Sequence, residues 1–220
     1  MPKKVRGNQL EFLASVHELA SSYVRRRFSQ LPPTEQIAVR RMALRVLQDR
    51  KMKRDEKLRD GAVRFIVALL PKTLPLVRRL LADRSSPLWY EVHFMIFASL
   101  DKGDFDRSGQ ASVLRLVHDY LSAINSDAGS AAWKAGDLLG DEWFSHETEK
   151  LLQSLLLNAN HPAGRRAALH GIEHALNHKP RASRDRLFAL VRQAASHDRS
   201  AVVRRDAALA LRGVGCGPSM

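Results

Sequence analysis

Hydrophobic side chains recur every three or four residues along most of the chain, which is the spacing of one face of an α-helix. One such stretch predicts a helix from Asn8 to about Gln30, and the adjacent Pro32 and Pro33 end it. A second helix follows, and a third runs from Asp55 to Leu70. Long runs that alternate hydrophobic and polar residues, as half-buried strands do, are absent. We therefore expect an all-α protein.

From residue 74 onward the predicted helices come in pairs. The pairs are Leu74–Leu81 with Leu88–Leu100, Ala111–Ile124 with Ser130–Leu139, Glu147–Leu157 with Ala163–Leu176, and Arg184–Ala195 with Ala201–Val214. The break inside each pair puts Asp, Asn or Ser before the second helix, where these side chains cap free N–H groups. Pro87 and Pro162 fall where a first-turn proline loses no hydrogen bond. Successive breaks lie about 33 to 44 residues apart, the period of a helical-hairpin repeat.

The residues of the last pair carry a family resemblance. Asp198–Leu211 reads DRSAVVRRDAALAL and resembles the second half of a HEAT repeat, in which an aspartate turn leads into a Val-Arg step and an alanine-rich helix. His161–Leu169 is a looser copy, and Ala132–Gly140 is looser still. The resemblance implies a right-handed α-α superhelix, a HEAT-like repeat solenoid. We expect one such domain over residues 8–214, between a basic tail at 1–7 and a C-terminal tail at 215–220.

The composition indicates the cellular compartment in which the protein functions. The only cysteine, Cys216, cannot form an intrachain disulfide, and no signal peptide precedes the first helix. Both features favour a reducing, cytoplasmic location. The longest apolar runs, Phe65–Leu70 and Phe94–Leu100, are far shorter than the roughly 18–20 residues of a membrane span. We therefore expect no membrane partner.

The charge changes the functional picture more than any other property of the sequence. The chain has 36 Lys and Arg against 23 Asp and Glu, a net charge of +13. Residues 1–64 alone hold 16 basic and 7 acidic side chains, including the clusters Arg25–Arg27 and Arg40–Arg41. A field of this size attracts polyanions such as nucleic acid or an acidic protein surface. The alternative is an ordinary solvated helix surface.

A second resemblance involves three residues. Trp133 and Asp137 lie four apart on one helical face, and Arg166 lies in the next repeat. This arrangement is similar to that of the alkylpurine DNA glycosylases built from HEAT-like repeats. The resemblance implies that Asp137 stabilises the positive charge of a departing alkylated base, and that Arg166 holds the DNA backbone. Two departures are Lys134, where the family has an acidic residue, and Leu209, where it has an aromatic one.

The same residues also have a purely structural interpretation. Trp133 would then pack between repeats, while Asp137 would pair with Arg165 or Arg166 in a ladder of inter-repeat ion pairs.

The segment from His170 to His174 contains two histidines four apart and Glu173 between them. This order resembles the inverted zinc-peptidase motif, which also needs a glutamate ligand further along the chain. No glutamate follows Glu173. We therefore expect no metal and no cofactor, and interpret His170, His174 and His178 as a stripe that lines a surface groove.

The primary hypothesis is a HEAT-repeat protein that binds nucleic acid, with duplex DNA as the favoured ligand, through contacts to the backbone. One alternative is an alkylpurine glycosylase-like enzyme of base-excision repair with Asp137 as its catalytic residue. Another is a protein-interaction scaffold with an acidic partner. The expected nucleic-acid-binding residues are Arg40, Arg41, Trp133, Lys134, Arg165, Arg166, His170, Arg204 and Arg205.

Overall fold

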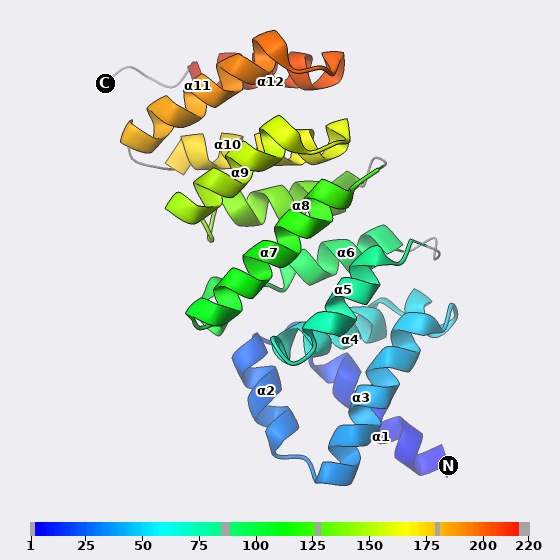
Figure 1. The fold of residues 1–220 in the computed structure, drawn as a ribbon. Coiled ribbons are helices and arrows are strands. Elements are labelled where there is room, and N and C mark those ends of the chain that lie inside the picture. Colours follow the sequence, from blue (N-terminus) through cyan, green and yellow to red (C-terminus); the bar gives the residue numbers. More distant parts are fainter. Residues whose placement is uncertain (1–2, 85–88, 126–128, 179–180, 216–220) are drawn as a thin grey trace. The chain divides into compact units, whose positions relative to one another are not determined.

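The computed structural model describes residues 3–84, 89–125, 129–178 and 181–215, and every regular element in these ranges is a helix. The expectation of an all-α protein is therefore confirmed (Figure 1). The chain divides into two compact units, Met1–Gly109 and Gln110–Met220, a division that the sequence did not predict. No helix among the described residues combines the length and the apolar character needed to cross a membrane.

In the first unit, α4 is the central helix and packs against α1, α2, α3 and α6. Gly61 lets α4 approach α1 closely, because a Cβ there would lie 1.9 Å from the carbonyl oxygen of Leu13. One turn further on, the ring of Phe65 meets those of Phe12 and Phe28 edge-on. The elements of this unit are α1 (Lys3–Ser15), α2 (Ser21–Ser29), α3 (Pro33–Gln48), η1 (Met52–Arg54), α4 (Glu56–Ala68), α5 (Leu74–Ala82), α6 (Trp89–Ala98) and η2 (Lys102–Asp104).

The predicted single helix from Asn8 to Gln30 is wrong, because the chain turns between α1 and α2. Both helices pack on α4, and one straight helix would hold Phe12 and Phe28 about 24 Å apart, too far for both rings to contact Phe65. The first helix also begins at Lys3, inside the range expected to be a basic tail.

In the second unit, α10 is central and packs against α8, α9, α11 and α12. The helices match the predicted pairs to within a few residues, and Pro162 is the first residue of α10 as expected. Pro87 and Asp127, two other residues of the predicted breaks, lie outside the described residues. The elements are α7 (Arg107–Ala123), α8 (Gly129–Gly140), α9 (His146–Asn158), α10 (Pro162–His178), α11 (Arg181–His197) and α12 (Ala201–Gly215).

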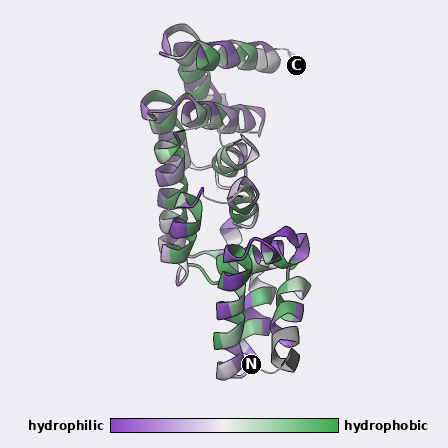
Figure 2. Ribbon diagram, turned by 90° about the vertical axis from the view of Figure 1, so that its right-hand side faces the viewer, coloured by the Kyte–Doolittle hydropathy of each residue, from purple (hydrophilic) through white to green (hydrophobic). Residues whose placement is uncertain are grey.

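Each of these helices carries both hydrophobic and hydrophilic positions (Figure 2). The hydrophobic ones form the core of the second unit because they are removed from water where the helices meet. This core includes Leu139, Leu152, Leu155, Ala168, Ile172, Leu187, Val191, Val203 and Ala207.

Glycines bring α8 and α10 into backbone contact. A Cβ on Gly140 would lie 1.9 Å from the carbonyl oxygen of Gly171, and one on Gly136 would lie 2.2 Å from that of Ala167. A Cβ on Gly171 would in turn lie 2.5 Å from the carbonyl oxygen of Gly136. In this packing only glycine fits at these positions, because any side chain would collide with the backbone of the facing helix. We call this contact the glycine seam.

Candidate functional site

The glycine seam sets Asp137 of α8 against two histidines of α10. Oδ1 of Asp137 lies 2.7 Å from Nε2 of His170 and 3.2 Å from Nε2 of His174. Asp137 follows Gly136 directly, and His170 precedes Gly171 directly, so the close backbone approach places these side chains face to face. Nδ1 of His170 lies 3.5 Å from Oε2 of Glu173.

This cluster perturbs the acid–base properties of its members. Burial opposes the charged form of His170, but the contacts with Asp137 and Glu173 outweigh it and raise its pKa to about 9. Burial also opposes ionisation of Asp137, yet His170, His174 and Lys134 together hold the pKa of its carboxyl below the usual range. Without a metal, Asp137 and His170 therefore form a charged pair at neutral pH.

The geometry of the pair is poor for hydrogen bonding. Oδ1 of Asp137 is buried, and neither nearby imidazole N–H is directed at it well enough to form a hydrogen bond. The ligand atoms of Asp137, His170 and His174 nevertheless lie within 4.8 Å of one another.

A pocket of about 370 Å³ opens beside the cluster. The ring of Trp133 meets His170 edge-on with centroids 4.4 Å apart, and the guanidinium of Arg166 lies 5.4 Å from the Trp133 ring centre. Asp137 does not line this pocket. His170 does, and it contacts both Trp133 and Asp137. We call it the Trp133 pocket; its lining is Trp133, Arg166, Leu169, His170, Glu173, Asp206 and Leu209.

Arg165 is not available to a ligand, which corrects its assignment as a nucleic-acid-binding residue. Its side chain is 2% exposed and donates two hydrogen bonds to Asp198, from Nε at 2.8 Å and from Nη2 at 3.0 Å. Its Nη1 donates to the carbonyl oxygens of Ala159 and Asn160. The guanidinium thus joins the turn before α10 to the turn before α12.

Two further arginines of α10 and α12 have internal partners. Nε of Arg166 donates to Asp206 at 2.7 Å, although its side chain remains 27% exposed beside Trp133. Arg204 donates to the backbone carbonyl of Asp198 at 2.6 Å. Arg166 can still turn a face toward a ligand in the Trp133 pocket, and Arg204 is half-buried.

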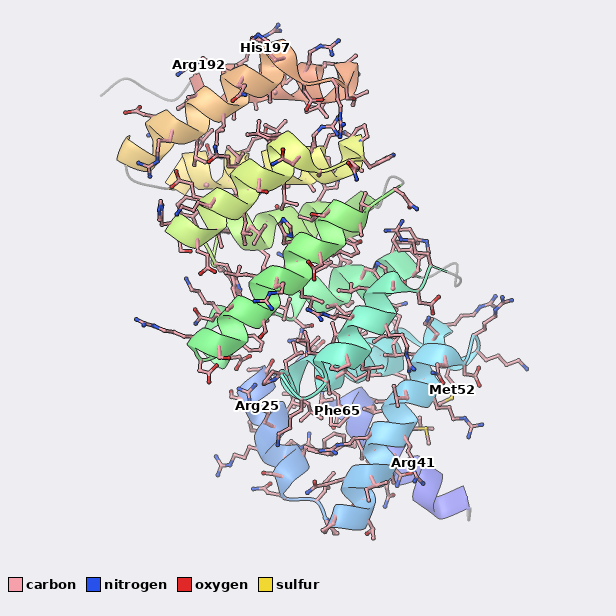
Figure 3. All side chains as sticks on the ribbon, viewed as in Figure 1. Arg25, Arg41, Met52, Phe65, Arg192 and His197 are labelled. Carbon is pink, nitrogen blue, oxygen red and sulfur yellow. The ribbon has the colours of Figure 1, made fainter. Side chains whose placement is uncertain are left out.

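Arg205 is the most accessible cation near the pocket, with a side chain 68% exposed and a long contact of 3.3 Å to Asp206. Lys134 of α8 is half-buried next to Trp133 in the sequence. Arg40 and Arg41 lie on α3, in the first unit. The guanidinium of Arg40 covers the Phe28 ring at 5.2 Å, and Arg41 is exposed (Figure 3).

The expected pairing of Asp137 with Arg165 or Arg166 is wrong, because both arginines are taken by aspartates of the last pair. Of the predicted histidine stripe, His170 lines the Trp133 pocket and His174 does not, while the side chain of His178 lies outside the described residues. Sequence reasoning missed Asp206 and the role of Glu173. The pair Gly136 and Gly140, four residues apart, was the signal that α8 approaches another backbone beside Asp137.

Comparison with known proteins gave no matching family model, no similar curated protein and no similar solved structure.

Proposed function

We propose that the second unit is a HEAT-like helical-repeat module that binds nucleic acid and accepts an unstacked base in the Trp133 pocket. The observation that carries this proposal is the aromatic wall of the pocket, formed by Trp133 with the guanidinium of Arg166 over its ring. Stacking of a base on an aromatic side chain contributes about 1–3 kcal/mol and tolerates any base. The pocket volume of about 370 Å³ lies in the range of small-molecule sites, roughly 300–1,000 Å³.

The cations around the pocket would hold the phosphates on either side of that base. Arg205 is well exposed, and Lys134 lies next to Trp133 on α8. The contact that the sequence assigned to Arg165 is not part of this set, since its guanidinium is buried and bonded internally. Binding through such contacts weakens steeply as salt rises.

The repeat architecture belongs to the proposal as well. It is supported by the pairing of helices in the second unit and by the contacts of α10 with both α8 and α12. Three ion pairs connect the α9–α10 pair to the α11–α12 pair: Arg165 with Asp198, Arg166 with Asp206, and Arg186 with Glu149. Contacts that join each hairpin to the next are what a stacked array requires.

Fluorescence anisotropy with labelled duplex and single-stranded oligonucleotides at low salt tests the proposal. We expect Trp133→Ala to weaken binding of the single strand by about 5- to 100-fold, the equivalent of 1–3 kcal/mol. Arg205→Glu should weaken both ligands. Arg192→Glu is the matched control, because Arg192 is exposed on α11, outside the pocket lining (Figure 3). Undetectable binding by the parent protein, or equal losses in Arg205→Glu and Arg192→Glu, would rule the proposal out.

A second candidate is an alkylpurine glycosylase-like activity. It is favoured by Glu173 and Asp206, whose carboxylates line an aromatic pocket and suit a planar cation such as an alkylated base. The position of Asp137 counts against it, since that carboxylate faces His170 and His174 rather than the pocket. An assay for release of alkylated bases, comparing the parent with Asp137→Asn, decides the matter. If the parent releases none, the enzymatic candidate is excluded.

A further inference from the structure

We propose that Asp137, His170 and His174 form a binding site for a first-row transition-metal ion such as Zn²⁺. Two imidazoles and one carboxylate are a common donor set for zinc and for other divalent ions of this series. The proposal does not depend on nucleic-acid binding, because the ion alone is its ligand.

The donor atoms of the three side chains lie within 4.8 Å of one another, close enough to share one ion. Ligand atoms arranged tetrahedrally about 2.05 Å from zinc lie about 3.3 Å apart. The distance from Oδ1 of Asp137 to Nε2 of His174 is 3.2 Å, and that to Nε2 of His170 is 2.7 Å. The Asp137–His174 distance thus matches the spacing that zinc requires, while the His170 ring must move away from Asp137 by a few tenths of an ångström. The same ion would satisfy Oδ1 of Asp137, which is buried and has no directed donor.

The surroundings of His170 match those of a metal-binding imidazole. Its Nε2 faces Asp137 and its Nδ1 lies 3.5 Å from Oε2 of Glu173. Histidine ligands commonly direct the second ring nitrogen to a carboxylate, which fixes the tautomer and makes the first nitrogen a better ligand. The edge of Trp133 restrains the ring from a third side.

The scaffold holds the donors in place before any ion arrives. His170 and His174 lie one turn apart on α10, and their ring centres are 4.8 Å apart. Asp137 comes from α8 across the glycine seam, where Gly136, Gly140 and Gly171 let the two backbones pack in direct contact. A rigid site of this kind binds an ion without ordering a loop, which keeps the entropic cost low.

The carboxylate of Asp137 is a donor that the sequence motif did not include, which is why the sequence predicted no metal site. The pattern of His170, Glu173 and His174 was discounted because no glutamate follows it. The fold supplies a carboxylate from the preceding pair of helices instead, and Asp137 lies upstream in the chain.

The full-length chain, stripped with a chelator, is titrated with Zn²⁺ in a calorimeter and with Co²⁺ in an absorption spectrometer. We expect one ion per chain, a visible ligand-field band from bound cobalt, and a rise in Tm on zinc addition. His174→Gln and Asp137→Asn should each weaken zinc binding at least 100-fold. Glu173→Gln should weaken it about 10- to 100-fold, as loss of a carboxylate behind a ligating histidine does. His197→Ala, which removes an exposed histidine of α11 outside the cluster, should change it less than 2-fold (Figure 3).

The zinc and cobalt titrations test the metal site independently of nucleic-acid binding. A folded parent that takes up no zinc and gives no cobalt band overturns the proposal and leaves only an ion pair between Asp137 and His170. Zinc bound with unchanged affinity in both His174→Gln and Asp137→Asn overturns it too, since the ion then binds elsewhere. If either variant fails to fold, the cobalt spectrum of the parent still decides, because four-coordinate cobalt with nitrogen and oxygen ligands absorbs far more strongly, and at longer wavelength, than hydrated cobalt, whose visible band is weak. Failure of oligonucleotide binding leaves each of these results unaffected.

Discussion

Replacement of Arg165 by methionine removes the guanidinium but keeps most of the buried stem. The guanidinium makes two hydrogen bonds to Asp198 and two to the carbonyl oxygens of Ala159 and Asn160. The side chains of Arg165 and Asp198 are 2% and 6% exposed, so water cannot take over these contacts. Breaking a buried ion pair by removing one partner costs about 3–5 kcal/mol, because the remaining charge stays buried and uncompensated. We expect Arg165→Met to lower the free energy of unfolding of the second unit by that amount.

Urea unfolding followed by tryptophan fluorescence measures this loss. Trp143 is 1% exposed in the second unit, and a Trp89→Phe background removes the signal of the first unit's tryptophan. The variant Arg192→Ala is the control, since Arg192 is exposed and such substitutions usually stay within about 0.5 kcal/mol. A loss below about 1 kcal/mol in Arg165→Met would refute the reasoning.

A double variant separates charge from packing. Asp198→Asn removes the second charge but keeps an oxygen that accepts the N–H of Ser200. Neighbouring residues in one network show coupling of about 0.5–3 kcal/mol. The pair Arg165→Met with Asp198→Asn should therefore be more stable than Arg165→Met alone. If it is less stable, the cost of the single change lies in packing and not in the unpaired carboxylate.

Two further predictions concern the glycine seam and a buried histidine. Gly140→Ala and Gly171→Ala should each destabilise the second unit by about 1–3 kcal/mol in the same urea assay, since a Cβ would collide with backbone across the seam. Gly213→Ala on α12 meets nothing within 4 Å and should instead stabilise it by about 0.5–1 kcal/mol; the opposite order would contradict the seam. Burial lowers the pKa of His93 to about 4, against the opposing hydrogen bond to the carbonyl oxygen of Leu80. The unfolded chain then binds the proton first, so the first unit should lose about 3 kcal/mol of stability as pH falls from about 6.5 to 4. Thermal unfolding across this range should show that slope in the parent and not in His93→Gln.

The sequence by itself determined the helices of the second unit and their limits. The spacing of hydrophobic residues predicted the buried face of each helix, and the capping residues predicted where each helix begins. Both signals depend on only a few neighbouring residues. Pro162 was placed correctly at the start of α10 for the same local reason. The sequence also identified Trp133, Arg166 and His170 as candidate site residues. In the structure the Arg166 guanidinium and the His170 ring both contact the Trp133 ring.

Only the tertiary structure decided how those residues are partnered. The turn between α1 and α2 follows from both helices packing on α4, a contact with residues far along the chain. Asp137 meets His170 and His174 because the glycine seam brings α8 and α10 together across some thirty residues, and Arg165 is used by Asp198 across a similar separation. A helical pattern shows which face is apolar, but it carries no information on which neighbour that face will meet or at what depth. For that physical reason the residues of the candidate site could be listed from the sequence, while their chemistry depends on the packing of the helices.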